Sequence, residues 1–234
     1  MPKYKKVVLK LSGEALMNSG KDGIIDFDFV GRIAKQIKRC TSEGVSFAIV
    51  IGGGNIWRGA GKTIDRTRAD HMGMLATVIN SLAVQSVLEE NGIETRTMTA
   101  LQMNQVAEPY IRNKALSHMK KGRVVIIACG SGNPYFSTDT AAVLRGAELG
   151  AEVVLFAKNI DGVYTADPKK DPSAKKIDNI TYDDIIHKDL AVIDSTASAF
   201  GRDNDLPLLL FGLNDPENIY RAVNGDKIGT IVSL

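Results

Sequence analysis

The sequence is poor in residues that build disulfides or metal sites. Only two cysteines occur among 234 residues, Cys40 and Cys129, and both lie within apolar patterns. We therefore expect buried free thiols in a reducing compartment rather than a disulfide. The three histidines, His71, His118 and His187, have no partner at metal-ligand spacing, so no resident metal site is predicted.

Long apolar runs and long basic runs are also missing. The N-terminal segment is basic, but only residues 7–9 are apolar before Lys10, which is too short for a signal peptide. No stretch approaches the roughly 20 apolar residues that a membrane span needs. The formal net charge is only +2, which gives no support to a large nucleic-acid surface. We expect a cytoplasmic protein that binds neither membranes nor nucleic acid.

Short apolar strands alternate with helical patterns along the whole chain. Strands are expected at residues 7–11, 47–51, 93–98, 124–128, 153–157, 208–211 and 229–232. Because most of these are continuous apolar runs, they predict a mostly parallel sheet covered on both faces, a three-layer α/β/α sandwich. Residues 159–179 are expected to form a loop. We predict one domain over residues 1–234, with two functional halves that divide near residue 150.

The helices are predicted from apolar spacing and from their end signals. Asp28 is expected to cap a helix that ends at Gly44. Further helices are expected at 111–122 and 138–149, from Thr181 and from Asp215. A long helix before Gly92 is expected to have an apolar side made of Leu75, Val78, Ile79, Leu82 and Val87, and either a core position or packing between subunits explains this side equally well.

A glycine-rich segment follows the strand expected at 47–51. Residues 52–54 are all glycine, and Arg58 lies shortly after them. Glycine lets the backbone approach a ligand and present its N–H groups. Such N–H groups beside a cation suit a phosphate, so this segment indicates nucleotide chemistry.

Two common nucleotide motifs do not fit this segment. A P-loop ending in Gly61-Lys62-Thr63 needs a glycine five positions before Gly61, where the chain has Ile56. A dinucleotide fingerprint that starts at Gly52 or Gly130 needs a later glycine, and the chain has Trp57 and a tyrosine in those places. The remaining interpretation is a phosphate site built by several loops at the carboxyl edge of the sheet.

Three other strand ends carry residues suited to such a site. Lys10-Leu11-Ser12-Gly13 ends the first strand with a cation, a hydroxyl and a glycine. Residues 131–138 follow the strand at 124–128 and include small, hydroxyl and aromatic side chains. Residues 161–168 follow the strand at 153–157. Together with the glycine run, they predict a polar ligand site at one sheet edge.

These motifs, in this order, closely resemble those of the bacterial uridylate (UMP) kinase family within the amino-acid kinase superfamily. The block at 161–168 is shared with carbamate, glutamate and aspartate kinases, whereas the segment at 70–77, Asp-His-Met-Gly-Met-Leu-Ala-Thr, points to UMP kinases. The resemblance spans essentially the whole chain. It implies transfer of the γ-phosphoryl group of ATP to UMP, with Mg²⁺ carried by the ATP phosphates, in pyrimidine nucleotide (CTP) biosynthesis.

The resemblance also implies the residues of the site. The catalytic residues would be Lys10, Arg58, Asp139 and Asp194. The ATP-binding residues would be Lys10, Leu11, Ser12, Gly13, Gly54, Arg58, Lys158, Asn159, Tyr164 and Asp167. Which of Lys158 and Asn159 meets the adenine stays open. The UMP-binding residues would be Gly53, Asp70, Ser131, Gly132, Asn133, Pro134, Tyr135, Phe136, Ser137 and Thr138. UMP would thus bind the half formed by residues 1–150, and ATP the half formed by 151–234.

Members of the family usually form homohexamers regulated by GTP and UTP, so the resemblance implies these properties too. Residues 18–23 match a region linked to GTP activation in some members, although a solvated loop explains their composition equally well. Two other functions stay open: a kinase for an amino-acid carboxylate or carbamate, and a nucleotide-binding sensor or storage protein without turnover. The joint presence of the four catalytic candidates argues against a pure binder.

Overall fold

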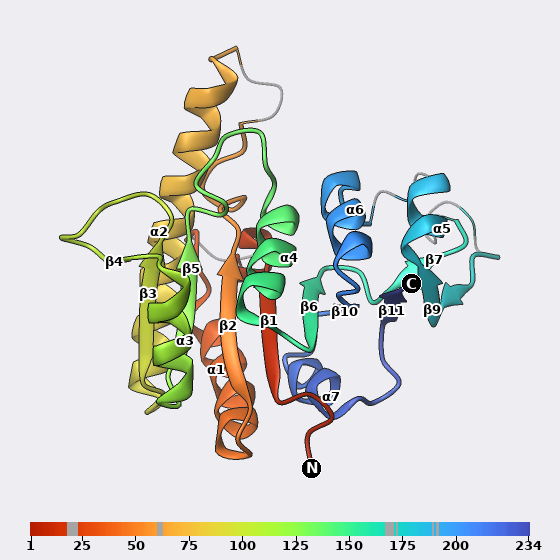
Figure 1. Ribbon diagram of the computed structural model, residues 1–234, viewed down its shortest axis with the longest axis horizontal. Helices are drawn as coiled ribbons and strands as arrows, with labels where there is room; N and C mark the ends of the chain where they lie inside the picture. The colour runs from red at the N-terminus through yellow and green to blue at the C-terminus, as the bar shows by residue number, and fades with distance from the viewer. Residues whose placement is uncertain (18–22, 60–62, 167–170, 172, 189, 191) are drawn as a thin grey trace.

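The computed structural model describes residues 1–17, 23–59, 63–166, 171, 173–188, 190 and 192–234. Within these residues, a nine-stranded sheet runs in the order β4-β3-β5-β2-β1-β6-β10-β11-β9, and a separate two-stranded sheet pairs β7 with β8 (Figure 1). Neighbouring strands of the large sheet are parallel except β10 and β11. The predicted mostly parallel sheet is confirmed.

The strands are β1 (Lys6–Leu11), β2 (Ser46–Ile51), β3 (Thr95–Thr99), β4 (Glu108–Pro109), β5 (Val124–Ala128), β6 (Val153–Lys158), β7 (Val163–Tyr164), β8 (Lys176–Ile177), β9 (Asn179–Thr181), β10 (Leu208–Gly212) and β11 (Thr230–Ser233). The helices are α1 (Phe27–Ser42), α2 (Arg66–Glu90), α3 (Arg112–Lys120), α4 (Thr138–Leu149), α5 (Tyr182–His187), α6 (Ser195–Asp203) and α7 (Glu217–Asn224), with a short 3₁₀ helix η1 (Gly13–Leu16) after β1.

Two hydrophobic cores lie on opposite faces of the large sheet. Successive strand side chains point to opposite faces, so Leu9 packs in one core and Val8 in the other. Helices α1, α2 and α7 contribute to the core around Leu9, and α3, α4, α5 and α6 to the core around Val8. This arrangement is the three-layer α/β/α sandwich that the sequence predicts (Figure 1).

The sheet order brings four loops to one edge. Strands β5, β2, β1 and β6 are adjacent and parallel, so their carboxyl ends lie side by side. The last residue of β1, Leu11, pairs with Ile51 of β2 and with Ala157 of β6. The segments after these strands, which the sequence singles out, therefore begin next to one another.

One local prediction about the helices is wrong. Helix α1 is capped by Asp26, whose carboxylate accepts a hydrogen bond from the Phe29 amide at 2.9 Å, whereas Asp28 lies inside the first turn.

The apolar side predicted for α2 is only partly buried. Val78 and Val87 are buried, whereas Leu75, Ile79 and Leu82 have 40–52% of their surface accessible. Because α2 is apolar on more than one side, apolar spacing alone does not identify the buried side.

Helix α2 is relevant to the prediction that no stretch of the sequence is apolar enough to span a membrane. It has 25 residues and is long and apolar enough, by length and composition alone, to cross a membrane. Half of its most apolar 18-residue window is buried inside the fold, where Val84 and Leu88 belong to the core around Leu9. The helix thus packs as a core helix, although its composition is richer in apolar residues than expected.

Several short elements are missing from the sequence prediction. The segment expected as a loop at 159–179 contains β7 and β8, which pair antiparallel between Val163 and Ile177, and the start of β9. Strand β4 and helix α6 are also additional. A two-residue strand is too short to produce an apolar period, and α6 shows few apolar residues.

Some glycines at the sheet edge are required by packing between the loops. A Cβ atom at Gly13 would lie 2.6 Å from the Gly54 nitrogen and 2.8 Å from the Gly52 oxygen. A Cβ atom at Gly53 would lie 2.8 Å from the Gly73 oxygen of α2. A Cβ atom at Gly54 would meet nothing closer than 3.5 Å. The loops after β1 and β2 can touch each other and α2 only because Gly13 and Gly53 have no side chain.

We expect Gly13→Ala to destabilise the protein by about 2–3 kcal/mol, because the added methyl group would push two backbone segments apart. The matched variant Gly54→Ala should change the free energy of unfolding by less than about 1 kcal/mol. Urea denaturation followed by circular dichroism measures both. Equal stability of the two variants would contradict the packing argument.

Candidate active site

A buried ion cluster lies where β1, β6 and α4 meet. Lys10 and Lys158 project from the same face of the sheet as Val8 and Phe156, toward the start of α4. Asp139, in the first turn of α4, accepts from both lysines: its Oδ1 lies 3.0 Å from Lys10 Nζ and its Oδ2 lies 2.9 Å from Lys158 Nζ. The side chains of Lys10, Asp139 and Lys158 are only 8%, 15% and 18% exposed.

Burial and charge shift the titration of this cluster. Burial raises the pKa of the Asp139 carboxyl, but the charges of Lys10 and Lys158 outweigh burial, and the pKa lies below its usual value. Burial lowers the pKa of Lys158, and Asp139 opposes this only in part. Asp139 contacts both lysines, and the nearby Asp194 carboxylate also favours the charged form of Lys158, so two carboxylates lie beside the two ammonium groups. The ammonium groups are the cations that an anionic ligand such as a phosphate would contact.

Asp194 joins the starts of two helices. It caps α6 by accepting from the Ala197 amide at 2.8 Å. The same carboxylate accepts from the Ser137 hydroxyl, and from the Thr140 hydroxyl at 3.0 Å, and Ser137 is itself the cap of α4. A segment of the first predicted half is thereby fixed to a segment of the second beside Asp139.

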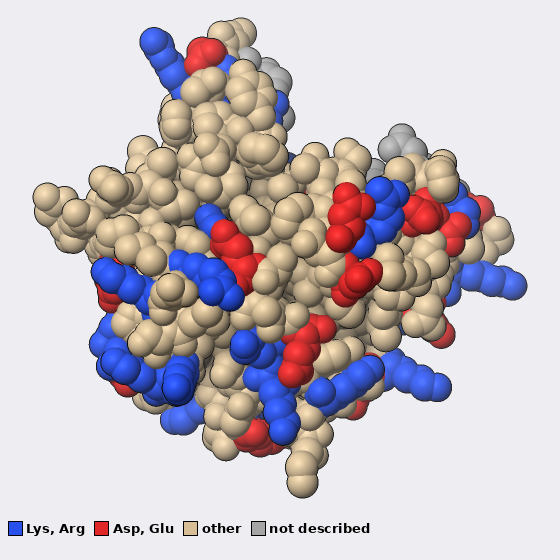
Figure 2. Space-filling model, viewed as in Figure 1, with Lys and Arg blue, Asp and Glu red and all other residues tan. Residues whose placement is uncertain are grey.

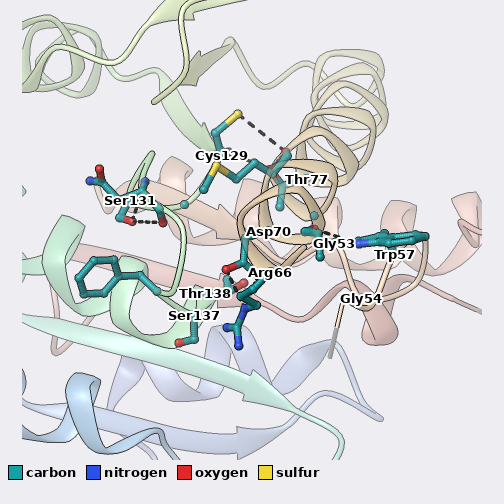
Figure 3. A pocket seen from close by; sticks show the side chains of 17 residues that line it. Gly53, Gly54, Trp57, Arg66, Asp70, Thr77, Cys129, Ser131, Ser137 and Thr138 are labelled. Carbon is teal, nitrogen blue, oxygen red and sulfur yellow. Dashed lines mark hydrogen bonds and ion pairs between the residues drawn. The ribbon is translucent and has the colours of Figure 1, made fainter. Parts of the chain in front are cut away.

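A cleft of about 270 Å³ opens between the start of α2, the glycine run and the loop after β5 (Figure 3). Seven of the ten residues predicted to bind UMP line it, namely Gly53, Asp70, Ser131, Asn133, Phe136, Ser137 and Thr138. Gly132, Pro134 and Tyr135 belong to the same loop but are not among its lining residues. The other ten lining residues are not predicted to bind UMP, namely Gly54, which is predicted for ATP, and Trp57, Gly59, Arg66, Ala69, Gly73, Met74, Thr77, Cys129 and Gly130.

Asp70 is already engaged within this cleft. Its carboxylate accepts from Arg66 Nε at 2.9 and 3.0 Å and from the Tyr135 amide at 2.8 Å. The Arg66 guanidinium also lies 5.4 Å from the centre of the Tyr135 ring. The only sequence signal for Arg66 is its position one helical turn before Asp70, the spacing of an ion pair on one helix face.

The loop after β5 begins with an unusual backbone conformation. Cys129 and Gly130 are consecutive left-handed residues, with φ angles of 64° and 57°. A left-handed non-glycine residue costs about 1–3 kcal/mol unless its surroundings hold it. The Thr77 hydroxyl of α2 accepts from the Cys129 amide at 2.8 Å, and Cys129 is fully buried. The two residues turn the chain into the cleft wall.

Arg58 lies beside a second cleft. It forms an ion pair with Glu14 of η1, and its Nε donates to the Gly54 carbonyl at 3.3 Å. The cleft measures about 530 Å³ and includes Arg58 and Asn159 in its lining. Lys158, the neighbour of Asn159, turns instead toward Asp139 and also donates to the Val192 carbonyl. Lys158 and Asn159 thus lie in two different environments.

The other predicted ATP-binding residues are more scattered. Leu11 is fully buried, and Ser12 caps η1 by accepting from the Ala15 amide at 3.1 Å. The Tyr164 hydroxyl donates to Asp161 at 2.9 Å. Asp167 lies outside the described residues, as do Lys62 and residues 18–22.

A dedicated Mg²⁺ site would need free carboxylates. Among the residues that the structure describes, no group of three or more His, Cys, Asp and Glu side chains is arranged to hold a metal ion. Asp139 and Asp194 are already bound by lysines and hydroxyls. The donor set therefore fits a metal that is held mainly by a ligand's own phosphates.

Comparison with known proteins agrees with this geometry. The structure of a UMP kinase from Bacillus anthracis superposes with a TM-score of 0.94 at 38% identity, covering 98% of this chain and 96% of that one. The structure of a UMP kinase from Ureaplasma parvum superposes with a TM-score of 0.93 at 35% identity, covering 99% of this chain and 100% of that one. The structure of a uridylate kinase from Archaeoglobus fulgidus superposes with a TM-score of 0.75 at 28% identity, covering 97% of this chain and 99% of that one. The model of the amino acid kinase family matches residues 5–212, and the chain belongs to that family.

Proposed function

We propose that the protein is a UMP kinase, which transfers the γ-phosphoryl group of ATP to UMP and yields UDP and ADP for pyrimidine nucleotide (CTP) biosynthesis. The observation that carries the proposal is the buried Lys10–Asp139–Lys158 cluster beside the 270 Å³ cleft. The likeness to UMP kinases along nearly the full length of both chains supports the choice of UMP as the acceptor.

Phosphoryl transfer asks mainly for in-line positioning and for positive charge around the transferring group. Lys10 and Lys158 supply two ammonium groups, and Asp139 lies between them, offsets their mutual repulsion and orients both. We assign Lys10, Arg58, Asp139 and Asp194 to the catalytic machinery, with Asp194 holding the start of α4 through Ser137 and Thr140. Mg²⁺, bound to the phosphates of ATP, would supply further positive charge when present.

We assign UMP to the 270 Å³ cleft. Ser131 and Asn133 offer polar groups, Phe136 offers an apolar wall, and Arg66 adds a positive charge. The Gly53 amide would face the phosphate. Asp70 would accept from the ribose as the resemblance implies, while its bonds to Arg66 and Tyr135 hold it in place.

We assign ATP to the other side of the cluster. The 530 Å³ cleft contains Arg58 and Asn159, which favours Asn159 over Lys158 as the neighbour of adenine. Lys10 and the Ser12–Gly13 segment would contact the phosphates, and Tyr164 and Asp167 the adenosine. In this assignment residues 1–150 hold UMP, and ATP is held by residues 151–234 together with Lys10, Ser12–Gly13 and Arg58 of the first half, within one domain.

The strongest competing function is a kinase for a small carboxylate or carbamate acceptor, which the family model alone would allow. The cleft argues against it, because it is walled by the aromatic side chains Trp57 and Phe136 and extends from the glycine run to Ser131. A nucleobase needs such walls, whereas a carbamate does not.

We further propose a homo-oligomer, a homohexamer regulated by GTP and UTP as the resemblance implies. Met72, Leu75, Ile79 and Leu82 form an exposed apolar stripe at helical spacing on α2, each at least 40% exposed. In Figure 2, basic and acidic side chains lie at the tip of the part of α2 that projects beyond the sheet, and uncharged surface lies below them. A stripe of this kind favours burial against another subunit. The two buried free thiols favour a cytoplasmic location.

Acceptor choice tests the proposed function. We expect ATP- and Mg²⁺-dependent release of ADP with UMP, and kcat/KM at least tenfold lower with CMP, dUMP or AMP, measured in a coupled ADP-release assay. Glutamate, aspartate and carbamate serve as acceptor controls. Turnover with one of these controls but not with UMP would sink the proposal.

Replacing a lysine tests the assignment of the reacting centre. Lys10→Met should lower kcat by about 10²–10³-fold, because it removes a buried cation from the transferring phosphoryl group. Lys62→Ala, in the sequence that mimics a P-loop, should change kcat by less than about threefold. The reverse ranking would revive the P-loop interpretation. Circular dichroism checks that both variants fold.

Disrupting the stripe on α2 tests the oligomer. Ile79→Glu places a charge in the middle of the apolar stripe, and we expect a smaller particle than the wild type by size-exclusion chromatography with light scattering. Lys35→Glu on α1 is the control for an added negative charge elsewhere. An unchanged mass for Ile79→Glu, or a monomeric wild type, contradicts the proposal.

A further inference from the structure

We propose that Arg145, a residue of α4 that does not line either cleft, is a positioning residue for the acceptor nucleotide. It would act by holding the carbonyl of Gly130 and thereby the wall of the 270 Å³ cleft. The proposal rests on the proposed UMP kinase function and adds a residue that the sequence motifs do not single out.

The Arg145 side chain is 6% exposed and makes a three-part set of contacts. Its Nη2 donates to the Gly130 carbonyl at 3.0 Å. Its Nη1 donates to Glu148 Oε2 at 2.7 Å. The guanidinium lies 4.1 Å from the centre of the Tyr110 ring. Only a planar, forked cation can make these contacts together, so a lysine is not an equivalent replacement.

The partners of Arg145 are themselves anchored. The same Glu148 oxygen accepts from the Tyr110 hydroxyl at 2.7 Å, and the Tyr110 amide donates to the Thr99 carbonyl of β3 at 2.9 Å. Helix α4 lies next to α3 on one face of the sheet (Figure 1). The guanidinium is therefore tied both to its own helix and to the edge of the sheet.

The contact that matters for function is the one to Gly130. Cys129 and Gly130 are the two consecutive left-handed residues that start the loop after β5. From the opposite face of the sheet, Thr77 of α2 binds the Cys129 amide at 2.8 Å. Arg145 binds the next carbonyl from the α4 face. The turn is thus held from both sides, by one side chain each.

Burying a charge for packing alone is inefficient, because an apolar side chain of the same size would fill this space without desolvating a guanidinium. The cost is visible in the Nε atom of Arg145, which is buried and has no hydrogen-bond partner among the described residues. The presence of a cation here is best explained by the two hydrogen bonds that the Nη groups of Arg145 donate to Glu148 and to the Gly130 carbonyl.

Replacing Arg145 should weaken the binding of UMP and leave the binding of ATP unchanged. Cys129, Gly130 and Ser131 all line the 270 Å³ cleft, so a relaxed turn would move the groups that surround the acceptor. The contacts of Arg145 involve neither Lys10 nor Lys158. If Arg145 only stabilised the fold, its replacement would weaken the binding of both substrates or of neither.

The test compares steady-state kinetics of folded variants. We expect Arg145→Met to raise the KM for UMP at least tenfold, with the KM for ATP within twofold of the wild type, and Arg145→Lys to recover only part of the loss. The control is Arg112→Met. Arg112 binds the backbone carbonyl of Glu148 but not Gly130, so both KM values should stay unchanged.

A second readout does not depend on activity. In a Cys40→Ser background, Cys129 is the remaining thiol, and it is fully buried. We expect Arg145→Lys to speed its reaction with an aromatic disulfide reagent at least tenfold, and Arg112→Met to leave the rate unchanged.

The outcomes separate this inference from the proposed function. Suppose that the wild type turns over UMP. The positioning role is then wrong if the Arg145 variants keep the KM for UMP within twofold of the wild type, or if they raise the KM values for UMP and ATP equally. If the wild type does not use UMP, the proposed function fails, and the reactivity of the Cys129 thiol still decides whether Arg145 holds the turn.

Discussion

The proposed active site depends on one carboxylate placed between two buried lysines. Without Asp139, the ammonium groups of Lys10 and Lys158 would repel each other in a poorly solvated space. Asp139 lies in the first turn of α4, where the positive end of the helix dipole also favours a carboxylate. The parallel register of β1 and β6 brings both lysines to the same face and the same edge. In the proposed site, the two ammonium groups are what the phosphates of a nucleotide would meet.

Around this cluster, the start of α4 links the parts of the site. Ser137 and Thr138 line the 270 Å³ cleft, Asp139 binds the lysines, and Ser137 and Thr140 bind Asp194 at the start of α6. A few consecutive residues thus touch the cleft proposed for the acceptor, the lysine cluster and the start of α6. This connection is a physical reason for two substrates to be held in one fixed relation.

Much of this arrangement could be predicted from the sequence. The strand at 124–128 and the helix at 138–149 have the predicted bounds, because a continuous apolar run and a clear pair of end signals define them. The wrong helix cap, Asp28 for Asp26, arose because two neighbouring acids both satisfy a capping pattern. The sequence did not separate the buried from the exposed residues of α2, because apolar residues nearly surround that helix.

Arg66 and Arg145 were out of reach for a different reason. Each contacts a residue of a loop outside its own helix, Tyr135 for Arg66 and Gly130 for Arg145, and only the folded chain brings them together. The role of Gly53 was also incomplete from sequence, because its missing side chain is needed for contact with α2 as well as for a ligand.

The most direct measurement is a crystal structure with UMP and a non-hydrolysable ATP analogue bound together. The account predicts UMP in the cleft lined by Gly53, Arg66 and Ser131, and the γ-phosphate of the analogue in contact with Lys10 and Lys158. UMP bound instead beside Arg58 and Asn159, or a γ-phosphate that touches neither lysine, would contradict it.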